Sequence, residues 1–527
     1  MVDKTSLSKA LLSDMKQKGV DVDLALSVLD RINQGKYESG TVAFSEIPDI
    51  DDRSIVDIRG EIDWRLPRRE AEEALEKIEM LRGGDGSHNG EDPYEIVEDS
   101  FVFRRENLRT IGVGLLPTLA FGLLNGGSAT SYADILKNEA FSRELFDKYK
   151  GEFEEISDPI RGRSKGTTPA YINSDGSPGP SYIELKLRGL LLKVVEYGMN
   201  HGRNVQVLNP LFQMTSFSNN DEVVQALESY RSSAILAPLI ENTGVDITQT
   251  LTAIQPLIVA YTHQSEGIPR RVFDTAFGNP DSSLPLPGGH GQLFVVLRDV
   301  LSALHKKGKR YIQISNVDNI AATVDPVELA ILALSGRPGG FDFSHRTPVD
   351  VKGGVLVRQL DGSLTCADLG AAIGKAEVND AEKQGKSILF NCATGLFDLS
   401  YLLENLDRIV AALPLRLSEQ EKGAGRYSQA EQITWEVIGL LKDPIIFAVD
   451  KYNRFLAAKL LVESMLTSGL HITDPDFPTS SDASQDLLYF GQRLHQGLIK
   501  LLKREYGMRM VKGRWEPRPV SELFSPI

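Results

Sequence analysis

Short apolar runs that alternate with helical patterns constrain the fold of this chain most strongly. Between about residues 107 and 467, apolar residues at helical spacing mark Ile183–Tyr197, Leu293–Lys306 and Leu399–Ala412. Short runs typical of buried strands occur at Val205–Leu208, Ala234–Ala237, Tyr311–Ile314, Gly354–Arg358, Ile388–Asn391 and Ile445–Val449. This alternation predicts an α/β domain with a mainly parallel or mixed sheet, in which ligands bind beyond the carboxyl ends of the strands.

The sequences before and after this region show a different pattern. Residues 1–105 show helical spacing, for example in the amphipathic stretch Arg69–Leu81, and predict an N-terminal helical region. Residues 468–527 begin with a linker rich in Asp, Pro and Ser, continue with an amphipathic helix at Gln485–Arg504, and predict a small helical C-terminal cap. We therefore expect three parts, at 1–105, 106–467 and 468–527.

The bulk composition excludes several classes of function. A net charge of −14 argues against a general nucleic-acid or anionic-membrane binder, although it allows a local basic pocket. Two cysteines in 527 residues indicate a reducing compartment and no disulfide framework. The N-terminus lacks an apolar signal segment, and no stretch of about 18 apolar residues occurs. We expect a cytoplasmic protein with no nucleic-acid or membrane partner.

A glycine-rich loop follows the apolar run Leu119–Leu124. It contains Asn125, Gly126 and Gly127 and then the hydroxyl residues Thr130 and Ser131. Paired glycines let backbone N–H groups approach a phosphate closely, and the hydroxyl groups add donors. The pattern is typical of a phosphate cradle, although two glycines after a strand more often form an ordinary turn.

A histidine lies among glycines in the stretch Pro285–Phe294, directly before a predicted helix. His290 is therefore expected on a tight loop at a helix N-terminus, where backbone N–H groups face anions. A structural role is the alternative for a single histidine.

Polar residues end the predicted strand at Tyr311–Ile314. Ser315, Asn316, Asp318 and Asn319 place one carboxylate among neutral oxygens, which suits Mg²⁺ because this ion prefers one or two carboxylates together with substrate phosphates. An Asx turn that caps the next helix is the alternative.

Cationic side chains follow several of these segments. Lys352 precedes Gly353 and a strand, Lys459 closes the stretch R-F-L-A-A-K, and Lys165 belongs to a dense basic cluster with Arg161 and Arg163. Each of them, taken alone, is also typical of a solvated surface residue.

Taken together and in order, these stretches resemble the UDP-sugar pyrophosphorylases, specifically the UTP–glucose-1-phosphate uridylyltransferase family. The resemblance covers roughly residues 107–467, and S-N-V-D-N-I-A-A-T-V-D is its most specific piece. The matching stretches are Leu124–Thr130, Pro287–Gln292, Ser315–Asp325, Asp350–Gly354, Phe390–Asn391 and Arg454–Lys459.

The resemblance implies a nucleotidyltransferase domain with a Rossmann-like, glycosyltransferase-A-like core over residues 106–467. It implies that UTP and a sugar 1-phosphate, by default glucose 1-phosphate, give a UDP-sugar and pyrophosphate with Mg²⁺ bound by Asp318. Lys165, Lys459 and Asp318 would be catalytic. The nucleotide would be bound by Leu124, Asn125, Gly126, Gly127, Thr130 and Gly289, and the sugar phosphate by His290, Asn316, Lys352, Gly353 and Asn391.

The chain also departs from the pattern of this family. Ala129 replaces the last glycine of the family's loop, so a methyl group is expected where the backbone should approach a phosphate. Gln292 replaces an acidic residue or Asn, and the gap from Thr130 to Lys165 is long. The second Asn of the family's F-N-x-N is missing after Asn391, and the tail does not resemble the β-helix of eukaryotic members. Ala129 and the 131–164 insertion motivate an alternative hypothesis, a catalytically degenerate regulatory protein that binds a nucleotide-sugar.

Overall fold

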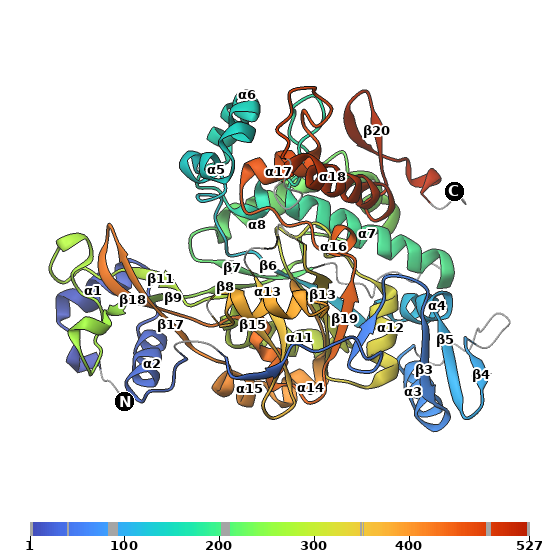
Figure 1. Cartoon of the computed structure of the whole chain (residues 1–527), viewed down its shortest axis with the longest axis horizontal. Coiled ribbons are helices and arrows are strands. Elements are labelled where there is room, and N and C mark those ends of the chain that lie inside the picture. The colour runs from blue at the N-terminus through green and yellow to red at the C-terminus, as the bar shows by residue number, and fades with distance from the viewer. Residues whose placement is uncertain are drawn as a thin grey trace.

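The computed structural model describes residues 4–38, 42–82, 93–201, 211–347, 350, 353–370, 372–480 and 486–523. These residues form an eleven-stranded mixed sheet at the centre of the molecule (Figure 1). Eight of its strands follow one another in the order β2 (Ile55–Asp57), β19 (Ile445–Val449), β13 (Gly339–His345), β16 (Leu389–Asp398), β12 (Tyr311–Asn316), β6 (Leu119–Leu124), β7 (Phe212–Ser216) and β8 (Leu251–Gln255). The other three are β14 (Gly354–Gln359), which pairs with β16, and its neighbours β1 (Phe44–Glu46) and β15 (Leu364–Asp368).

The strand directions place most carboxyl ends on one edge of the sheet. β2, β19 and β13 run parallel to one another, as do β12, β6, β7 and β8. β16 is antiparallel to both β13 and β12, so these two groups point the same way. Loops that follow β6, β12 and β19 therefore emerge on a common edge, where ligands bind in open α/β sheets.

Helices cover both faces of the sheet (Figure 1). Along β6, Phe121 and Leu123 belong to one buried cluster, whereas Ala120 and Leu124 belong to the other. The first cluster includes residues of α4 (Arg105–Leu115), α7 (Tyr182–His201), α12 (Pro326–Ser335) and α18 (Leu487–Arg504). The second includes residues of α10 (Leu293–Val296), α11 (Arg298–Lys306), α14 (Leu399–Glu404) and α15 (Leu406–Ala412). Burial on both faces explains why β6 is an uninterrupted apolar run.

The predicted mixed α/β fold is confirmed. Predicted strands correspond to β12, β14, β16 and β19, and the predicted helix at Ile183–Tyr197 corresponds to α7. The stretches Leu293–Lys306 and Leu399–Ala412 are each divided into two helices, with Leu297 and Asn405 at the breaks.

The strand predicted at Ala234–Ala237 is wrong. A turn there leads into helix α9 (Ala237–Thr243), whose first turn contains Pro238. A short apolar run alone does not separate a strand from the start of a helix, and a proline in the first turn favours the helix. The strand predicted at 205–208 lies outside the described residues.

The N-terminal part is less purely helical than its sequence predicts. It contains α1 (Lys9–Gln17), α2 (Val22–Asn33) and α3 (Arg68–Leu81), and also β1 and β2 of the central sheet and a small sheet of β3 (Asp63–Pro67), β4 (Glu95–Val97) and β5 (Ser100–Arg104). These strands have only three to five residues, which is too short for a clear alternation.

The predicted cap contains the long helix α18 and a hairpin of β20 (Met508–Val511) and β21 (Arg514–Pro517). No helix in the described ranges has the length and apolar character needed to cross a bilayer. The remaining helices and strands are α5 (Ile135–Phe141), α6 (Arg143–Ile160), α8 (Asn220–Tyr230), α13 (Lys375–Lys383), α16 (Lys451–Arg454), α17 (Leu461–Ser468), β9 (Leu257–Val259), β10 (Tyr261–Thr262), β11 (Pro285–Pro287), β17 (Arg416–Lys422) and β18 (Gly425–Glu431).

Candidate functional site

The glycine-rich loop and the Asp318 loop emerge side by side from the central sheet. β6 and β12 are parallel neighbours, and Leu124 and Asn316 are partners at their last register position. The backbone N–H of Val317 then donates to the carbonyl of Leu124 at 3.2 Å. The pairing of two strands far apart in the sequence thus brings two of the predicted site segments together.

Buried hydrogen bonds hold the start of the glycine-rich loop, and one of its glycines borders open space. Asn125 is fully buried, its backbone N–H donates to the carbonyl of Met214 at 2.8 Å, and its Nδ2 donates to Oε1 of Gln213 at 3.1 Å. A Cβ added to Gly126 would lie 3.3 Å from Gln255 Oε1, whereas one added to Gly127 would meet nothing within 4 Å. Gly127 therefore borders open space in which a ligand can reach the backbone.

The 131–164 insertion folds as a helical unit and returns to its starting point. α6 packs with α17 in a buried cluster, and Asn138 of α5 accepts a hydrogen bond from the backbone N–H of Val462 in α17. An antiparallel bridge joins Ser128 to Ser164. The backbone N–H of Lys165 donates to the carbonyl of Gly127 at 2.9 Å. The long gap in the sequence thus leaves Lys165 directly beside the glycine-rich loop.

Ala129 does not obstruct this loop. It is fully buried in the same cluster as α6 and α17, and its backbone N–H donates to the carbonyl of Arg163 at 2.8 Å. The expectation that its methyl group points where a phosphate should approach is wrong, because the methyl packs inside the protein. The two sequence features that motivated the degenerate alternative, Ala129 and the insertion, are therefore both accounted for by packing.

Lys165 is a buried cation, in contrast to its basic neighbours Arg161 and Arg163, whose side chains are about half exposed. Its Nζ donates to the carbonyl of Ala458 at 3.2 Å and lies over the ring of Tyr132. Burial lowers the pKa of Lys165 to about 7. The solvated-loop interpretation thus fails for Lys165, and its charge responds to whatever ligand enters the site.

Asp318 and Lys459 form an ion pair at the same sheet edge. The Nζ of Lys459 lies 2.7 Å from Oδ2 of Asp318. The Asp318 side chain is 12% exposed and that of Lys459 66%, so the pair sits at the boundary of the interior. Burial opposes the charge of Asp318, but Lys459 and Lys165 outweigh it and hold the pKa of this carboxyl below its usual value. The same pair raises the pKa of Lys459.

His290 lies on the predicted loop, and its ring is held by Thr434. The backbone N–H of Thr434 donates to Nδ1 of His290 at 3.1 Å, so the proton of the neutral ring is on Nε2. Burial, together with the charge of Lys459, lowers the pKa of His290 to about 4. His290 is therefore a neutral hydrogen-bond donor near Lys459 at physiological pH.

The glycines around His290 serve the protein's own packing. Gly289 has φ 83°, and a Cβ on it would lie 2.4 Å from the carbonyl oxygen of Gln432. Gln292 is buried and accepts a hydrogen bond from Gln255, so the residue that replaces the family's acidic residue or Asn has a structural partner. The predicted contact of Gly289 with the nucleotide stays a prediction.

The remaining predicted residues are placed less tightly. Lys352 lies outside the described residues. Gly353 has φ 135°, and Asn391 accepts a hydrogen bond from the backbone N–H of Ala393. Asn316 ends β12 and is partly exposed, and Thr130 is exposed and accepts a hydrogen bond from Ser128. Their contacts with a sugar phosphate or a nucleotide stay predictions.

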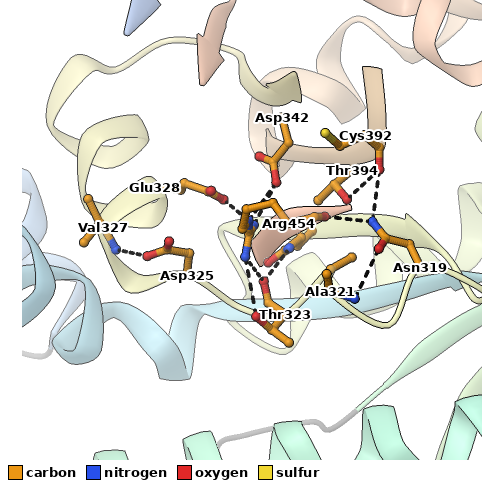
Figure 2. Close-up of polar contacts among 12 residues, drawn as sticks. Asn319, Ala321, Thr323, Asp325, Val327, Glu328, Asp342, Cys392, Thr394 and Arg454 are labelled. Carbon is orange, nitrogen blue, oxygen red and sulfur yellow. Dashed lines mark hydrogen bonds and ion pairs between the residues drawn. The ribbon is translucent and has the colours of Figure 1, made fainter. Parts of the chain in front are cut away.

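Sequence reasoning missed the network that fixes the loops of Asp318 and Lys459 to each other (Figure 2). Asn319 donates to the carbonyls of Cys392 and Arg454 and accepts from the backbone N–H groups of Ala321 and Leu456. All hydrogen-bonding capacity of this buried amide is therefore used to tie the loop after Asp318 to the loop before Lys459.

Arg454 anchors the same two segments through buried charges (Figure 2). Its guanidinium contacts Asp342 at 2.8 Å, Glu328 at 2.9 Å and the carbonyl of Thr323 at 3.0 Å. Burial raises the pKa of both carboxyls, and their partner arginine stays charged. The motif R-F-L-A-A-K contains this residue, but nothing local distinguishes a buried arginine from a surface one.

No group of three or more His, Cys, Asp or Glu side chains that could hold a metal occurs within the described part of the chain. A single carboxylate is nevertheless sufficient for Mg²⁺ when substrate phosphates supply further oxygens. Oδ1 of Asp318 is buried and has no partner among the described residues, so it fits such a ligand.

Comparisons with known proteins indicate the family of this chain. A family model described as UTP–glucose-1-phosphate uridylyltransferase matches residues 181–471. Enzymes of that name from Solanum tuberosum and Musa acuminata are both 26% identical to this chain, over 52% and 59% of it. The matches span 52% and 65% of the lengths of those relatives.

Solved structures show the same fold. A UDP-glucose pyrophosphorylase from Leishmania major superimposes with a TM-score of 0.53 at 17% identity, over 87% of this chain and 78% of that one. A UDP-glucose phosphorylase from Trypanosoma brucei gives 0.52 at 19% identity, over 85% and 76%. Since the family model matches more than half of the residues, the chain belongs to the UTP–glucose-1-phosphate uridylyltransferase family.

Proposed function

We propose that this protein transfers a uridylyl group from UTP to a sugar 1-phosphate, with glucose 1-phosphate as the default acceptor, and releases pyrophosphate. The observation that carries the proposal is the convergence of Gly127, Lys165, Asp318 and Lys459 at one sheet edge. The names of its curated relatives support the same reaction.

The chemistry is a direct in-line displacement. An oxygen of the sugar phosphate attacks the α-phosphorus of UTP, and the bond from this phosphorus to the oxygen of the leaving pyrophosphate breaks. Such a transfer requires positioning and charge neutralisation and no covalent protein nucleophile. Lys165 and Lys459 supply positive charge, and the backbone at Gly127 gives the phosphates close access to N–H groups.

Asp318 is the residue that would hold Mg²⁺, through its unpartnered Oδ1. When bound, the ion would neutralise charge on the phosphates of UTP. The Nε2–H of His290, fixed by Thr434, is a neutral donor suited to a phosphate or sugar oxygen.

Purified protein with UTP, Mg²⁺ and a panel of sugar 1-phosphates tests the proposal by coupled detection of pyrophosphate. We expect release with at least one sugar, and a loss of about 10²–10³-fold in Asp318→Asn, since the side chain that would hold the charge-neutralising Mg²⁺ loses its negative charge. Asp361→Asn, in an exposed turn, is the matched control and should keep full activity.

Two results would contradict the proposal. One is the absence of pyrophosphate with every sugar while calorimetry detects binding of a UDP-sugar, which supports the degenerate regulatory alternative. The other is full activity of Asp318→Asn, which removes Asp318 from the site.

A further inference from the structure

A second basic cavity lies on the same edge of the sheet, beyond the carboxyl ends of β2 and β19. Its volume is about 890 Å³, within the range of small-molecule sites. Its walls come from the segments after β2 and β19 and from α4, α7, α12 and α18, elements that gather on one side of the molecule in Figure 1. Neither Asp318 nor Lys459 lines it.

The lining is cationic although the chain is strongly acidic. Basic side chains outnumber acidic ones by nine to five, against a net charge of −14 for the whole protein. Two of the nine, Arg59 and Arg454, pair with carboxylates outside the lining, and the other seven remain against the five acidic residues. Lys500, Lys503 and Arg504 lie on one face of α18, and none of them has an ion pair with a described residue. Like charges at this spacing repel one another on a helix.

Other elements of the lining add cations whose hydrogen-bond partners are neutral groups. Arg105 donates to the carbonyl of Gly60 at 2.8 Å and also to that of Ile58, and Arg518 donates to the carbonyl of Glu522. Carbonyl oxygens satisfy the N–H groups without cancelling the charge. The helix dipole accounts for basic residues in the last turn of α18, but it does not account for these arginines on other elements.

The acidic residues of the lining are largely engaged. Glu196 pairs with Arg109 and Lys193, and Glu505 also pairs with Lys193. Asp325 and Asp450 accept backbone N–H groups as the N-caps of α12 and α16. Among the acidic lining residues, Glu106 alone has no ion pair or cap contact within the described part of the chain.

Part of the lining is held firmly. It includes Thr323 and Arg454, which are joined by a hydrogen bond of 3.0 Å within the buried network of Figure 2. A pocket with a fixed part of its lining and cations on several elements is preorganised for a ligand with several negative groups.

We propose that this cavity is a second site that binds a small polyanion carrying several phosphate groups. A chain of phosphates carries enough negative groups to meet the cations of α18 and the arginines of the other elements together, whereas a single phosphate meets fewer of them. The proposal does not depend on the uridylyltransferase activity.

Calorimetric titration of the full chain with inorganic tripolyphosphate tests the proposal. To separate this cavity from the Asp318 site, the titration is done on the wild type, on Lys459→Gln, and on the triple variant Lys500→Gln/Lys503→Gln/Arg504→Gln. Lys9→Gln/Lys16→Gln/Lys306→Gln, with exposed lysines on α1 and α11, is a control with the same change of net charge. A thermal melt of each variant checks the fold.

We expect binding that persists in Lys459→Gln and in the control, weakens at least tenfold in the α18 triple variant, and is much weaker for inorganic phosphate than for tripolyphosphate. The affinity should also fall with added salt. Wild-type affinity in the α18 variant, complete loss in Lys459→Gln, an equal loss in the control, or equal affinity for phosphate each overturns the proposal.

Discussion

Lys165→Met should make the protein more stable and inactive at the same time. Its pKa of about 7, compared with 10.5 in an unfolded chain, disfavours the charged form by roughly 5 kcal/mol. The folded state therefore binds fewer protons at this site between pH 7 and 10.5, and this contribution makes stability rise with pH in that window. Methionine fills the space without a charge, so its advantage is largest below pH 7.

The expected size of the effect follows from the length of the chain. At about 2.1 cal/mol/K per residue, 527 residues give an unfolding entropy of about 1.1 kcal/mol/K, so a stabilisation of about 5 kcal/mol corresponds to roughly 4–5 °C in Tm. At a slope of about 1.4 kcal/mol per pH unit, the advantage of Lys165→Met should fall to about 1 kcal/mol by pH 9.5.

Differential scanning fluorimetry at pH 6 and pH 9.5 measures both values. Lys150→Met, on the exposed side of α6, is the control and should show no pH-dependent difference. Pyrophosphate release should be lost in Lys165→Met and kept in the control. An unchanged or lower Tm of Lys165→Met at pH 6, or a difference that does not shrink at pH 9.5, would refute the assignment of Lys165 as a buried cation whose burial is costly.

Three further predictions concern the loops of the site. Gly289→Ala should cost about 2–3 kcal/mol of stability, because the φ of 83° and the carbonyl of Gln432 exclude a methyl group. Gly127→Ala should keep the wild-type Tm and lose turnover, and equal Tm values of the two variants would contradict this. Ala129→Gly should lower Tm, with a stability loss of about 1 kcal/mol, and give no gain in turnover, since its methyl is buried in a cluster with α6; faster turnover would restore the idea of a blocked loop. His290→Gln should lose less stability than the wild type when the pH falls from 7 to 5. The pKa of His290 is about 4 in the folded state and 6.5 ordinarily, so the wild type becomes less stable as the pH falls. Parallel pH profiles of stability would count against a buried neutral His290.

The sequence was sufficient for segments whose structure is decided locally. β6, β12 and β19 are apolar runs buried on both faces, and the polar residues that follow them can be recognised directly in the sequence. The parallel alternation of strands and helices then predicts that their carboxyl ends share one edge, which is how Asp318 comes to lie near the glycine-rich loop.

Features that depend on pairing between distant segments could not be predicted in this way. Lys165 reaches Gly127 only because the bridge between Ser128 and Ser164 closes a unit of two helices. β2 belongs to the central sheet because its three residues pair with β19, which lies almost 400 residues later in the sequence. The residues near one of these segments contain no signal of the distant segment with which it pairs. An isolated basic cluster, such as the one around Lys165, is therefore interpreted as a solvated loop.

The buried network around Arg454 explains how the candidate site keeps its shape. Two carboxylates and one guanidinium in the interior lose more hydration than their attraction returns in many proteins, so stability alone is a weak reason for them. Apolar side chains of the same volume would fill the space but would leave the loops free to slide, because dispersion contacts have little directional preference. Hydrogen bonds of Arg454 and Asn319 have fixed geometry and cross between the two segments. Arg454, before Lys459, donates to the carbonyl of Thr323, whereas Asn319, directly after Asp318, contacts the backbone of Arg454 and Leu456. The 2.7 Å contact between Asp318 and Lys459 therefore depends on groups behind the site, and mutations that loosen this network should impair phosphate positioning before they unfold the protein.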